Sequence, residues 1–328
     1  MNSVKPLVAP HRRSLPLKVG TRGSPLARAQ TANFLQILRH FCPVLKGMDV
    51  FEEHIINTTG DVVQDRPLAE IGGKGLFAKE IHESLAAGRI DFAVHSLKDL
   101  ETTLPPGITL ACTLKREDAR DVLILPSSHT VTDPADPYAS LPHGSTIGSA
   151  SVRRQAQLKH ARPDLNFVLL RGNVGTRLGK VESGEMAATL LAYAGLRRLG
   201  LHHRASIVLD ANIMVPSACQ GIVGITVRTA DTELCAMLAG IEDPEAKAVA
   251  TAERALLAAL DGSCRTPIGG YARLLDDNSL HLTGLVARAD GSFLLKRTAT
   301  GPKENAEQMG AALGASLKAD SPPDIFDI

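Results

Sequence analysis

The chain has 328 residues, of which 44% are hydrophobic and 22% charged, a composition that predicts two or three globular domains with a sizeable core. Its 36 Lys and Arg residues against 35 Asp and Glu residues leave a net charge of +1, which argues against bulk electrostatic binding to nucleic acid or to an anionic membrane. This neutral total is the balance of four strongly charged blocks. Residues 1–48, 49–145, 146–204 and 205–328 carry charges of +8, −8, +7 and −6.

The N-terminal segment and the cysteines bear on the cellular compartment. Residues 1–14 are basic and interrupted by prolines, so we expect a disordered extension, with a short organellar transit peptide as the alternative. The sequence contains no run of about 18 apolar residues, so we expect no membrane-spanning helix. The five cysteines are widely spaced and include no C-x-x-C pair, which indicates neither a disulfide framework nor a zinc site. We therefore expect a cytoplasmic protein without a metal site.

Strands alternate with helices through most of the chain. Ser24 followed by Pro25 is typical of an N-cap and a first helical residue, so we expect a helix to begin there. Residues 15–114 and 119–210 form two β-α-β blocks, each predicted to contain a mostly parallel sheet. The expected strands are 15–19, 50–56, 90–95, 108–114, 122–125, one ending at 146–148, 167–170 and 187–192; the expected helices are 25–40, 75–88, 152–161, 174–183 and 195–201.

The last third of the chain has a different pattern. A long Ala- and Leu-rich helix is predicted over 244–260, followed by a loop at 261–267. Three strands should follow, joined at residues 276–278 and 290–291 by sequences typical of hairpin turns. A final helix is expected over 303–318. This pattern predicts a small α+β unit with an antiparallel sheet.

Arginines recur where predicted strands end and helices begin. Arg22 follows the first strand, Arg153 and Arg154 lie in a first helical turn that disfavours cations, and the ranges 171–177 and 197–198 repeat the pattern. Ligands of open α/β sheets bind at the carboxyl ends of the strands, so this recurrence predicts a cleft for a substrate with several carboxylates. Taken singly, each motif is also explained by a capped helix with a solvated arginine.

Two further side chains could carry chemistry. Asp99 ends the run His95-Ser96-Leu97-Lys98-Asp99 after a strand, and a lone carboxylate among cations could stabilise a developing positive charge or exchange a proton. The alternative is a structural salt bridge. Cys264 lies on a polar loop beside Arg265, which favours an exposed thiol with thiolate character. It is a nucleophile, a covalent attachment point or an incidental loop cysteine.

An ordered series of motifs resembles the porphobilinogen deaminase family. The resemblance covers residues 15–318, and a series of this length is specific. The motifs lie at 20–27 (GTRGSPLA), 72–77, 93–100, 153–155 (RRQ), 171–178, 194–200, 220–221, 251–254 and 262–264 (GSC).

The resemblance implies an α/β fold with two type II periplasmic-binding-protein-like lobes around a cleft. A small α+β C-terminal domain with a three-stranded antiparallel sheet would follow. Domain 1 would comprise residues 15–114 and a return segment at 215–235, and domain 2 would comprise 119–210. Domain 3, at 240–328, would carry the cofactor cysteine.

The resemblance also implies a transferase, hydroxymethylbilane synthase, of haem and other porphyrin or tetrapyrrole biosynthesis. Four porphobilinogen molecules would be joined stepwise with loss of ammonia onto a dipyrromethane cofactor attached to Cys264, and water would release the linear tetrapyrrole. Each pyrrole carries an acetate and a propionate, which suits an arginine-lined cleft. Asp99 would be catalytic, stabilising the cationic azafulvene left by ammonia. The enzyme would be a monomer whose partner is porphobilinogen, with no nucleic acid or membrane.

The remaining site residues follow from the resemblance, position by position. Residues 72–77 would belong to a mobile loop beside the cleft. The cofactor ligands would be Ser24, Lys98, Asp99, Ser149, Arg153, Arg154 and Arg177, and the substrate ligands would be Arg22, Ser96, Arg171 and Arg198.

Two other functions remain open from the residues alone. One is a two-lobed binding protein for a small polycarboxylate, in which Cys264 is incidental. The other is a cysteine-dependent hydrolase, although no histidine base is evident near Cys264. Release of ammonia from porphobilinogen distinguishes the deaminase from both.

Overall fold

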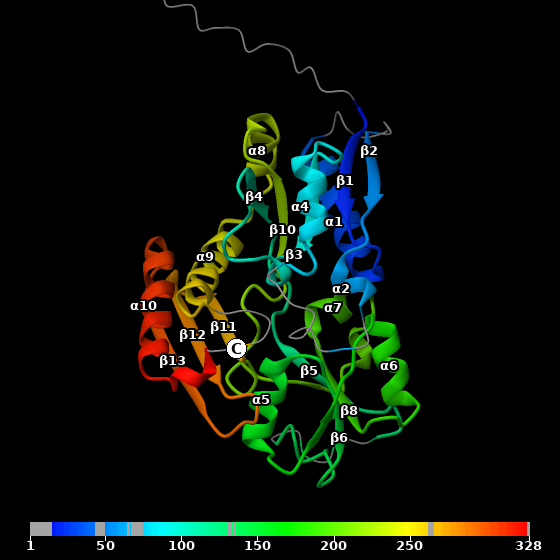
Figure 1. Cartoon of the computed structure of the whole chain (residues 1–328), viewed down its shortest axis with the longest axis vertical. Helices are drawn as coiled ribbons and strands as arrows, with labels where there is room; N and C mark the ends of the chain where they lie inside the picture. The colour runs from blue at the N-terminus through cyan, green and yellow to red at the C-terminus, as the bar shows by residue number, and fades with distance from the viewer. Residues whose placement is uncertain are drawn as a thin grey trace, which may run out of the picture.

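The computed structural model describes residues 15–42, 50–63, 66, 75–129, 131, 133, 136–261 and 266–326, so the predicted N-terminal extension lies outside the described residues. Within these ranges the chain forms two five-stranded sheets and one three-stranded sheet, arranged as three units (Figure 1). The predicted fold class is confirmed.

The strands and helices are bounded as follows. The strands are β1 Leu17–Thr21, β2 Phe51–Ile55, β3 Phe92–Ser96, β4 Ile108–Thr113, β5 Asp121–Ile124, β6 Thr146–Gly148, β7 Asn166–Val168, β8 Ala188–Ala192, β9 Ile207–Val208, β10 Val223–Arg228, β11 Ile268–Leu274, β12 Ser279–Ala287 and β13 Leu294–Pro302. The α-helices are α1 Pro25–Phe41, α2 Thr59–Val62, α4 Lys79–Ala86, α5 Val152–Ala161, α6 Val174–Glu182, α7 Tyr193–Arg198, α8 Thr232–Ala239, α9 Pro244–Ala259 and α10 Ala306–Ala319. Short 3₁₀ helices are η2 Leu97–Asp99, η3 His202–Arg204, η4 Lys303–Asn305 and η5 Pro323–Ile325.

The first lobe is built on the sheet β2-β1-β3-β10-β4. β1 runs parallel to β2 and β3, whereas β10 runs antiparallel to β3 and β4. The prediction of a mostly parallel sheet was therefore wrong for half of these pairings, because β10 returns to this lobe after the chain has built the second. The core between the sheet and α1 includes Phe34 and Phe92, whose rings meet edge to face at 5.4 Å.

Helix α1 shows why the first candidate site lies where it does. Ser24 has an extended backbone, and its Oγ accepts a hydrogen bond from the Ala27 amide at 3.2 Å, so the helix begins at Pro25 as predicted. Thr31, Phe34 and other residues at helical spacing are buried against the sheet. Because β1 ends only a few residues earlier, Arg22 is held at the carboxyl end of the sheet.

The second lobe repeats this arrangement with the sheet β7-β6-β8-β5-β9. β6 runs parallel to β7 and β8, and β5 runs antiparallel to β8 and β9, so the mostly parallel prediction again holds for only half of the pairings. The reason is that β5 enters from the first lobe in the opposite direction. Ile147 and Leu190 are buried on one side of this sheet, and Ile124 and Val181 on the other.

Two connecting segments, one between β4 and β5 and one between β9 and β10, cross between the lobes and are bonded to each other. The amide of Glu117 donates to the Gly221 carbonyl at 3.0 Å, and Arg116 Nε donates to the Gln220 carbonyl at 2.9 Å. Gly221 has a φ of 90°, and a Cβ there would lie 2.3 Å from the Glu117 carbonyl oxygen. Only glycine fits this close approach of two backbones.

The third unit is the antiparallel sheet β11-β12-β13, against which α9 and α10 pack (Figure 1). It is tied to the connecting segments through Glu253 of α9, which is fully buried. Glu253 pairs with Arg116 at 2.6 Å and accepts hydrogen bonds from the amides of Cys219 and Ala272, both at 2.5 Å. One buried carboxylate therefore joins α9, β11 and both connecting segments.

None of the helices in the described ranges combines the length and the apolarity needed to cross a bilayer.

Candidate active site

A pocket of about 560 Å³ lies between the first and second lobes. One wall comes from the β1–α1 junction, α2 and the end of β3, and the other from α5, the loop after β7, α6 and the end of β8. In both lobes the lining comes from the carboxyl ends of strands and the starts of the following helices, where the sequence predicted a ligand site. The predicted site residues that line it are Arg22, Ser24, Ser96, Lys98, Asp99, Arg154, Arg171 and Arg177.

Arg22 is held between two carboxylates of the first lobe. Its Nε and Nη2 donate to Asp61 at 2.9 and 2.5 Å, and its Nη1 lies 3.4 Å from Asp99 Oδ2. The guanidinium also stacks on Phe77, 4.2 Å from the ring centroid. Burial opposes ionisation of Asp61, but the hydrogen bonds from Arg22 and Thr58 hold the pKa of Asp61 below its ordinary value.

Lys98 and Asp99 project from the single turn η2 that follows β3. Lys98 Nζ donates to Gln220 Oε1 at 3.2 Å. Burial lowers the pKa of Lys98 to about 8; the nearby Asp99 charge opposes this shift and the Arg154 charge adds to it. Lys98 is therefore a cation whose charge depends on pH near neutrality.

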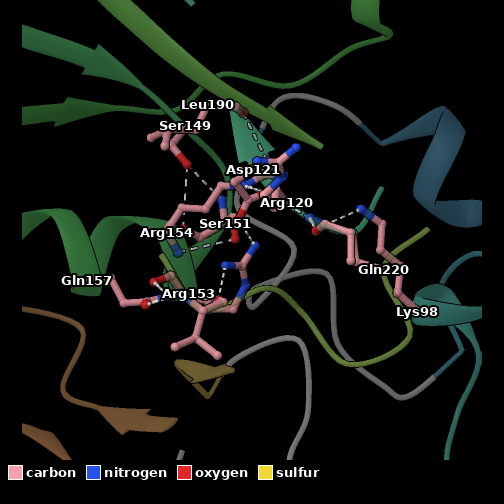
Figure 2. A network of polar contacts seen from close by, with 12 residues as sticks. Lys98, Arg120, Asp121, Ser149, Ser151, Arg153, Arg154, Gln157, Leu190 and Gln220 are labelled. Carbon is pink, nitrogen blue, oxygen red and sulfur yellow. Dashed lines mark hydrogen bonds and ion pairs between the residues drawn. The ribbon is translucent and has the colours of Figure 1, made fainter. Parts of the chain in front are cut away.

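Arg153 and Arg154 begin α5, and both bind the fully buried Asp121 of β5 (Figure 2). The ion pairs measure 2.8 Å for Arg153 and 2.7 Å for Arg154, and Arg154 Nη1 also donates to the Leu190 carbonyl at 2.9 Å. Burial would raise the pKa of Asp121, but the two guanidinium charges hold it well below its ordinary value. Arg154 lines the pocket, whereas Arg153 does not.

Arg171 and Arg177 complete the cationic wall of the second lobe. Arg171 reaches across to the first lobe, where its Nη1 and Nη2 donate to the carbonyls of Arg66 and Gly60 at 3.0 and 2.8 Å. Arg177 Nε donates to the Gly172 carbonyl at 2.8 Å, and no carboxylate of the described residues pairs with it. Burial, with repulsion from Arg154 and Arg171, lowers the pKa of Arg177 to about 10. Such mutual repulsion is relieved by a bound anion.

Three predicted site residues lie behind the pocket wall. Ser149 is buried, and its Oγ accepts a hydrogen bond from the Ser151 amide at 3.1 Å. Arg153 is held by Asp121 and by the Val215 carbonyl, the latter at 2.5 Å. Arg198 Nη2 donates to the Gly221 carbonyl at 2.6 Å, in the connecting segment. Ser149 Oγ, two nitrogens of Arg153 and one nitrogen of Arg198 are bonded to the protein, which favours support of the wall over direct ligand contact at these positions.

Cys264 and residues 72–74 lie outside the described residues. Phe77, the last residue of the predicted loop, lines the pocket against Arg22.

Some polar residues in and behind the pocket wall were not predicted as site residues from the sequence. Asp61 of α2 and Gln30 of α1 both line the pocket, and Gln30 Nε2 donates to Ser96 Oγ at 2.9 Å. Gln220, behind Lys98, was noted only as part of a motif. Gln30 follows Leu26 and Ala27 by four and three positions, and both also line the pocket, so the three residues share one face of α1. No local signal marks Asp61, because its role comes from contact with a residue of another element.

The charges of the pocket do not balance. Among the described residues, the lining has five cations, Arg22, Lys98, Arg154, Arg171 and Arg177, against the two carboxylates Asp61 and Asp99. His95 also lines it, and burial lowers its pKa to about 3, so this ring is neutral. No group of three or more His, Cys, Asp or Glu side chains suited to a metal occurs in the same ranges. The pocket suits an anionic organic ligand.

Comparison with known proteins identifies the family. The family model described as "Porphobilinogen deaminase, dipyromethane cofactor binding domain" matches residues 17–236, and "Porphobilinogen deaminase, C-terminal domain" matches residues 247–319. The chain belongs to the porphobilinogen deaminase family. Porphobilinogen deaminase of Paracoccus denitrificans (strain Pd 1222) is 44% identical over 314 residues, covering 95% of this chain and 96% of that protein. The chloroplastic porphobilinogen deaminase of Oryza sativa subsp. japonica is 44% identical over 313 residues, covering 95% and 86%.

Membership of the family confirms the resemblance found in the sequence motifs, the transferase class and the dipyrromethane cofactor. It leaves no ground for the alternative interpretations as a binding protein or a cysteine hydrolase.

The periplasmic VFT2 domain of Bordetella pertussis BvgS is similar at 16% identity and a TM-score of 0.39, covering 72% of this chain and 92% of that one.

The residues present fit the cofactor. A dipyrromethane carries an acetate and a propionate on each of its two rings, and its ring N–H groups are donors. The pocket offers forked guanidinium donors from both walls for the carboxylates, and Asp99 offers an acceptor for the N–H groups. The excess positive charge of the pocket lining is opposite in sign to the charge of such a ligand.

Proposed function

We propose that this chain joins four porphobilinogen molecules head to tail, each with loss of ammonia, onto a dipyrromethane attached to Cys264, and then releases hydroxymethylbilane by hydrolysis. The observation that carries the proposal is the convergence of five cations from both lobes on a pocket that also presents Asp99. Each added pyrrole brings two carboxylates, so the ligand becomes more anionic as it grows. A pocket with excess positive charge is suited to hold it.

The cations of the two walls bind the acetate and propionate groups. Arg22 and Arg171 are assigned to the incoming substrate, and Lys98, Arg154 and Arg177 to the cofactor. Arginine forks give bidentate bonds to carboxylates, and Lys98 supplies a point charge. Ser24 is assigned to the cofactor and Ser96 to the substrate as hydroxyl donors, while Ser149, Arg153 and Arg198 support the wall behind them.

Asp99 is the catalytic residue of this proposal. The aminomethyl C–N bond of porphobilinogen breaks, its electron pair leaves with ammonia, and positive charge develops on the substrate ring. The Asp99 carboxylate stabilises that charge and accepts a hydrogen bond from the ring N–H. When bound, the cofactor would supply the unsubstituted pyrrole carbon to which the first substrate carbon is joined, and the proton of that carbon would be lost to water. Arg22, 3.4 Å away, orients the carboxylate.

The intact mass of the purified protein tests the covalent attachment. We expect the mass to exceed that of the sequence by one dipyrromethane, and we expect Cys264→Ser to remove the excess and to abolish ammonia release from porphobilinogen. Cys235→Ser is the control, since that half-buried thiol lies on α8, and it should keep both properties. An unmodified protein that releases ammonia would contradict the proposal.

The proposal extends to domain bounds and cellular context. Domain 1 comprises residues 15–114 and 215–235, domain 2 comprises 119–210, and domain 3 comprises 240–328. The pairing of β10 with β3 and β4 supports the split first domain, and the separate sheet β11-β12-β13 supports the third. We propose a monomeric cytoplasmic enzyme of haem or other tetrapyrrole synthesis. The net charge of +1 supports the absence of nucleic-acid and membrane partners.

A further inference from the structure

Gln220 is a buried amide that contacts residues of both lobes. It lies in the connecting segment between β9 and β10 and is 1% exposed. Its Oε1 accepts from Lys98 Nζ at 3.2 Å, and its Nε2 donates to Asp121 Oδ1 and to the Ala119 carbonyl, both at 2.8 Å. Figure 2 shows the side chain between Lys98 and Asp121. Because both N–H groups face acceptors, the amide has one orientation, and its oxygen must face Lys98.

Asp121 continues this chain of contacts to the opposite wall. Its Oδ1 accepts from Arg154 Nε and Nη2 at 3.2 and 2.7 Å, and its Oδ2 pairs with Arg153. An unbroken series of polar contacts therefore runs from Lys98 through Gln220 and Asp121 to Arg154. It joins one cation of each pocket wall through the segment that connects the lobes.

We propose that Gln220 is a positioning residue that holds the Lys98 ammonium in the pocket and sets its spacing from Arg154. The inference rests on the proposed function, in which Lys98 binds a carboxylate of the cofactor. The cofactor carries the ring that the incoming porphobilinogen joins, so the position of Lys98 affects both cofactor loading and substrate binding. A lysine side chain is flexible, and a buried ammonium without an acceptor turns toward the nearest one. The carboxylate of Asp99 is the alternative acceptor on the same turn. Loss of Gln220 would thus move the ammonium away from the ligand and toward the catalytic carboxylate.

A double-mutant cycle tests this role. Gln220→Met preserves the length of the side chain and removes its polar atoms. In the cofactor-loaded enzyme we expect it to raise the KM for porphobilinogen about tenfold, as for loss of a charge-assisted hydrogen bond, with kcat changed less. We also expect a smaller fraction of the purified protein to carry the cofactor mass. In a Lys98→Met background, Gln220→Met should change KM and the loaded fraction by no more than about twofold.

Arg116→Lys is the matched control. Arg116 bonds the carbonyl of the same residue, and lysine keeps the charge opposite Glu253 while losing the guanidinium bond to Gln220. This variant should lower the thermal midpoint. Its effect on KM should be small, and it should be the same in the wild-type and the Lys98→Met backgrounds. An equal effect of Gln220→Met in both backgrounds would make Gln220 merely structural and would overturn the inference.

Gln220→Glu keeps the test decisive if the methionine variant does not fold. A buried glutamate is favoured in its protonated form, which can donate to Asp121 while its other oxygen accepts from Lys98. We expect KM to stay within about threefold of wild type while the thermal midpoint falls. A KM of Gln220→Glu that rises about tenfold would overturn the inference. If Lys98→Met alone leaves KM and loading unchanged while ammonia is still released, the inference fails but the proposed reaction stands.

Discussion

Arg153 and Arg154 stand in the first turn of α5, where the helix dipole disfavours cations, and the anion that offsets their charge is Asp121. The sequence predicted an anion at this position and assigned it to the ligand. The protein's own carboxylate instead pairs with both guanidinium groups, and only Arg154 also lines the pocket. Two adjacent arginines of similar character therefore differ in role because only one guanidinium reaches the pocket lining.

At the residue scale, Asp99→Asn tests the carboxylate that we propose to be catalytic. Asparagine has the same shape without the charge, so we expect kcat to fall about 10²- to 10³-fold, as for loss of an electrostatic group aimed at a developing charge. The thermal midpoint should hardly change, since Arg22 keeps its two bonds to Asp61. Asp277→Asn, in an exposed hairpin turn, is the control and should retain full kcat. Near-normal turnover of Asp99→Asn would return Asp99 to a structural role.

At the scale of elements, the starts of α1, α5, α6 and α9 followed from local chemistry, whereas the packing between helices did not. Ser24, Ser151 and Asn173 cap α1, α5 and α6 as residues of their type do. The contact between α9 and α10 depends on glycines instead. A Cβ at Gly310 would lie 2.2 Å from the Ala252 carbonyl oxygen, and one at Gly314 would lie 2.8 Å from that of Leu256.

Two glycine substitutions test this contact. Gly310→Ala should lower the thermal midpoint, because overpacking of this kind costs about 1–3 kcal/mol. Gly179→Ala in α6 is the matched control, since nothing lies within 4 Å of its added Cβ. Alanine is favoured over glycine in a helix by about 1 kcal/mol, so this variant should melt slightly higher. Equal shifts of the two midpoints in thermal unfolding would show that α9 and α10 do not pack this closely.

At the scale of the whole molecule, the two lobes together set the properties of Lys98. Its own lobe supplies Asp99, and the second lobe supplies Arg154, Asp121 and Arg153. Burial between the lobes lowers the pKa of Lys98 to about 8, with Asp99 and Asp121 opposing the shift and the two arginines adding to it. Neither lobe by itself would create this environment.

This shift predicts that the binding of ligand carboxylates by Lys98, and with it kcat/KM, depends on pH. Below pH 8 Lys98 is an ammonium that attracts carboxylates, and as the pH rises through about 8 it loses the proton and the attraction. We therefore expect kcat/KM to fall above pH 8, two or more pH units before an ordinary lysine would titrate. Lys98→Arg keeps its charge and should move this fall to higher pH. If the dependence of kcat/KM on pH is unchanged in Lys98→Arg, the fall above pH 8 is caused by another group.

The sequence by itself determined the α/β class, the starts of several helices and the family, and it placed eight of the pocket residues, because caps, periodicity and motifs are local patterns. The tertiary structure alone decided which cations line the pocket and which carboxylates hold them. Lys98 and Asp121 meet through Gln220, 122 and 99 positions away in sequence, and Arg22 meets Asp61, 39 positions away. The direction of β10 was settled in the same way, by its return from the second lobe. Such contacts depend on how the lobes fold onto each other, and no local pattern encodes them.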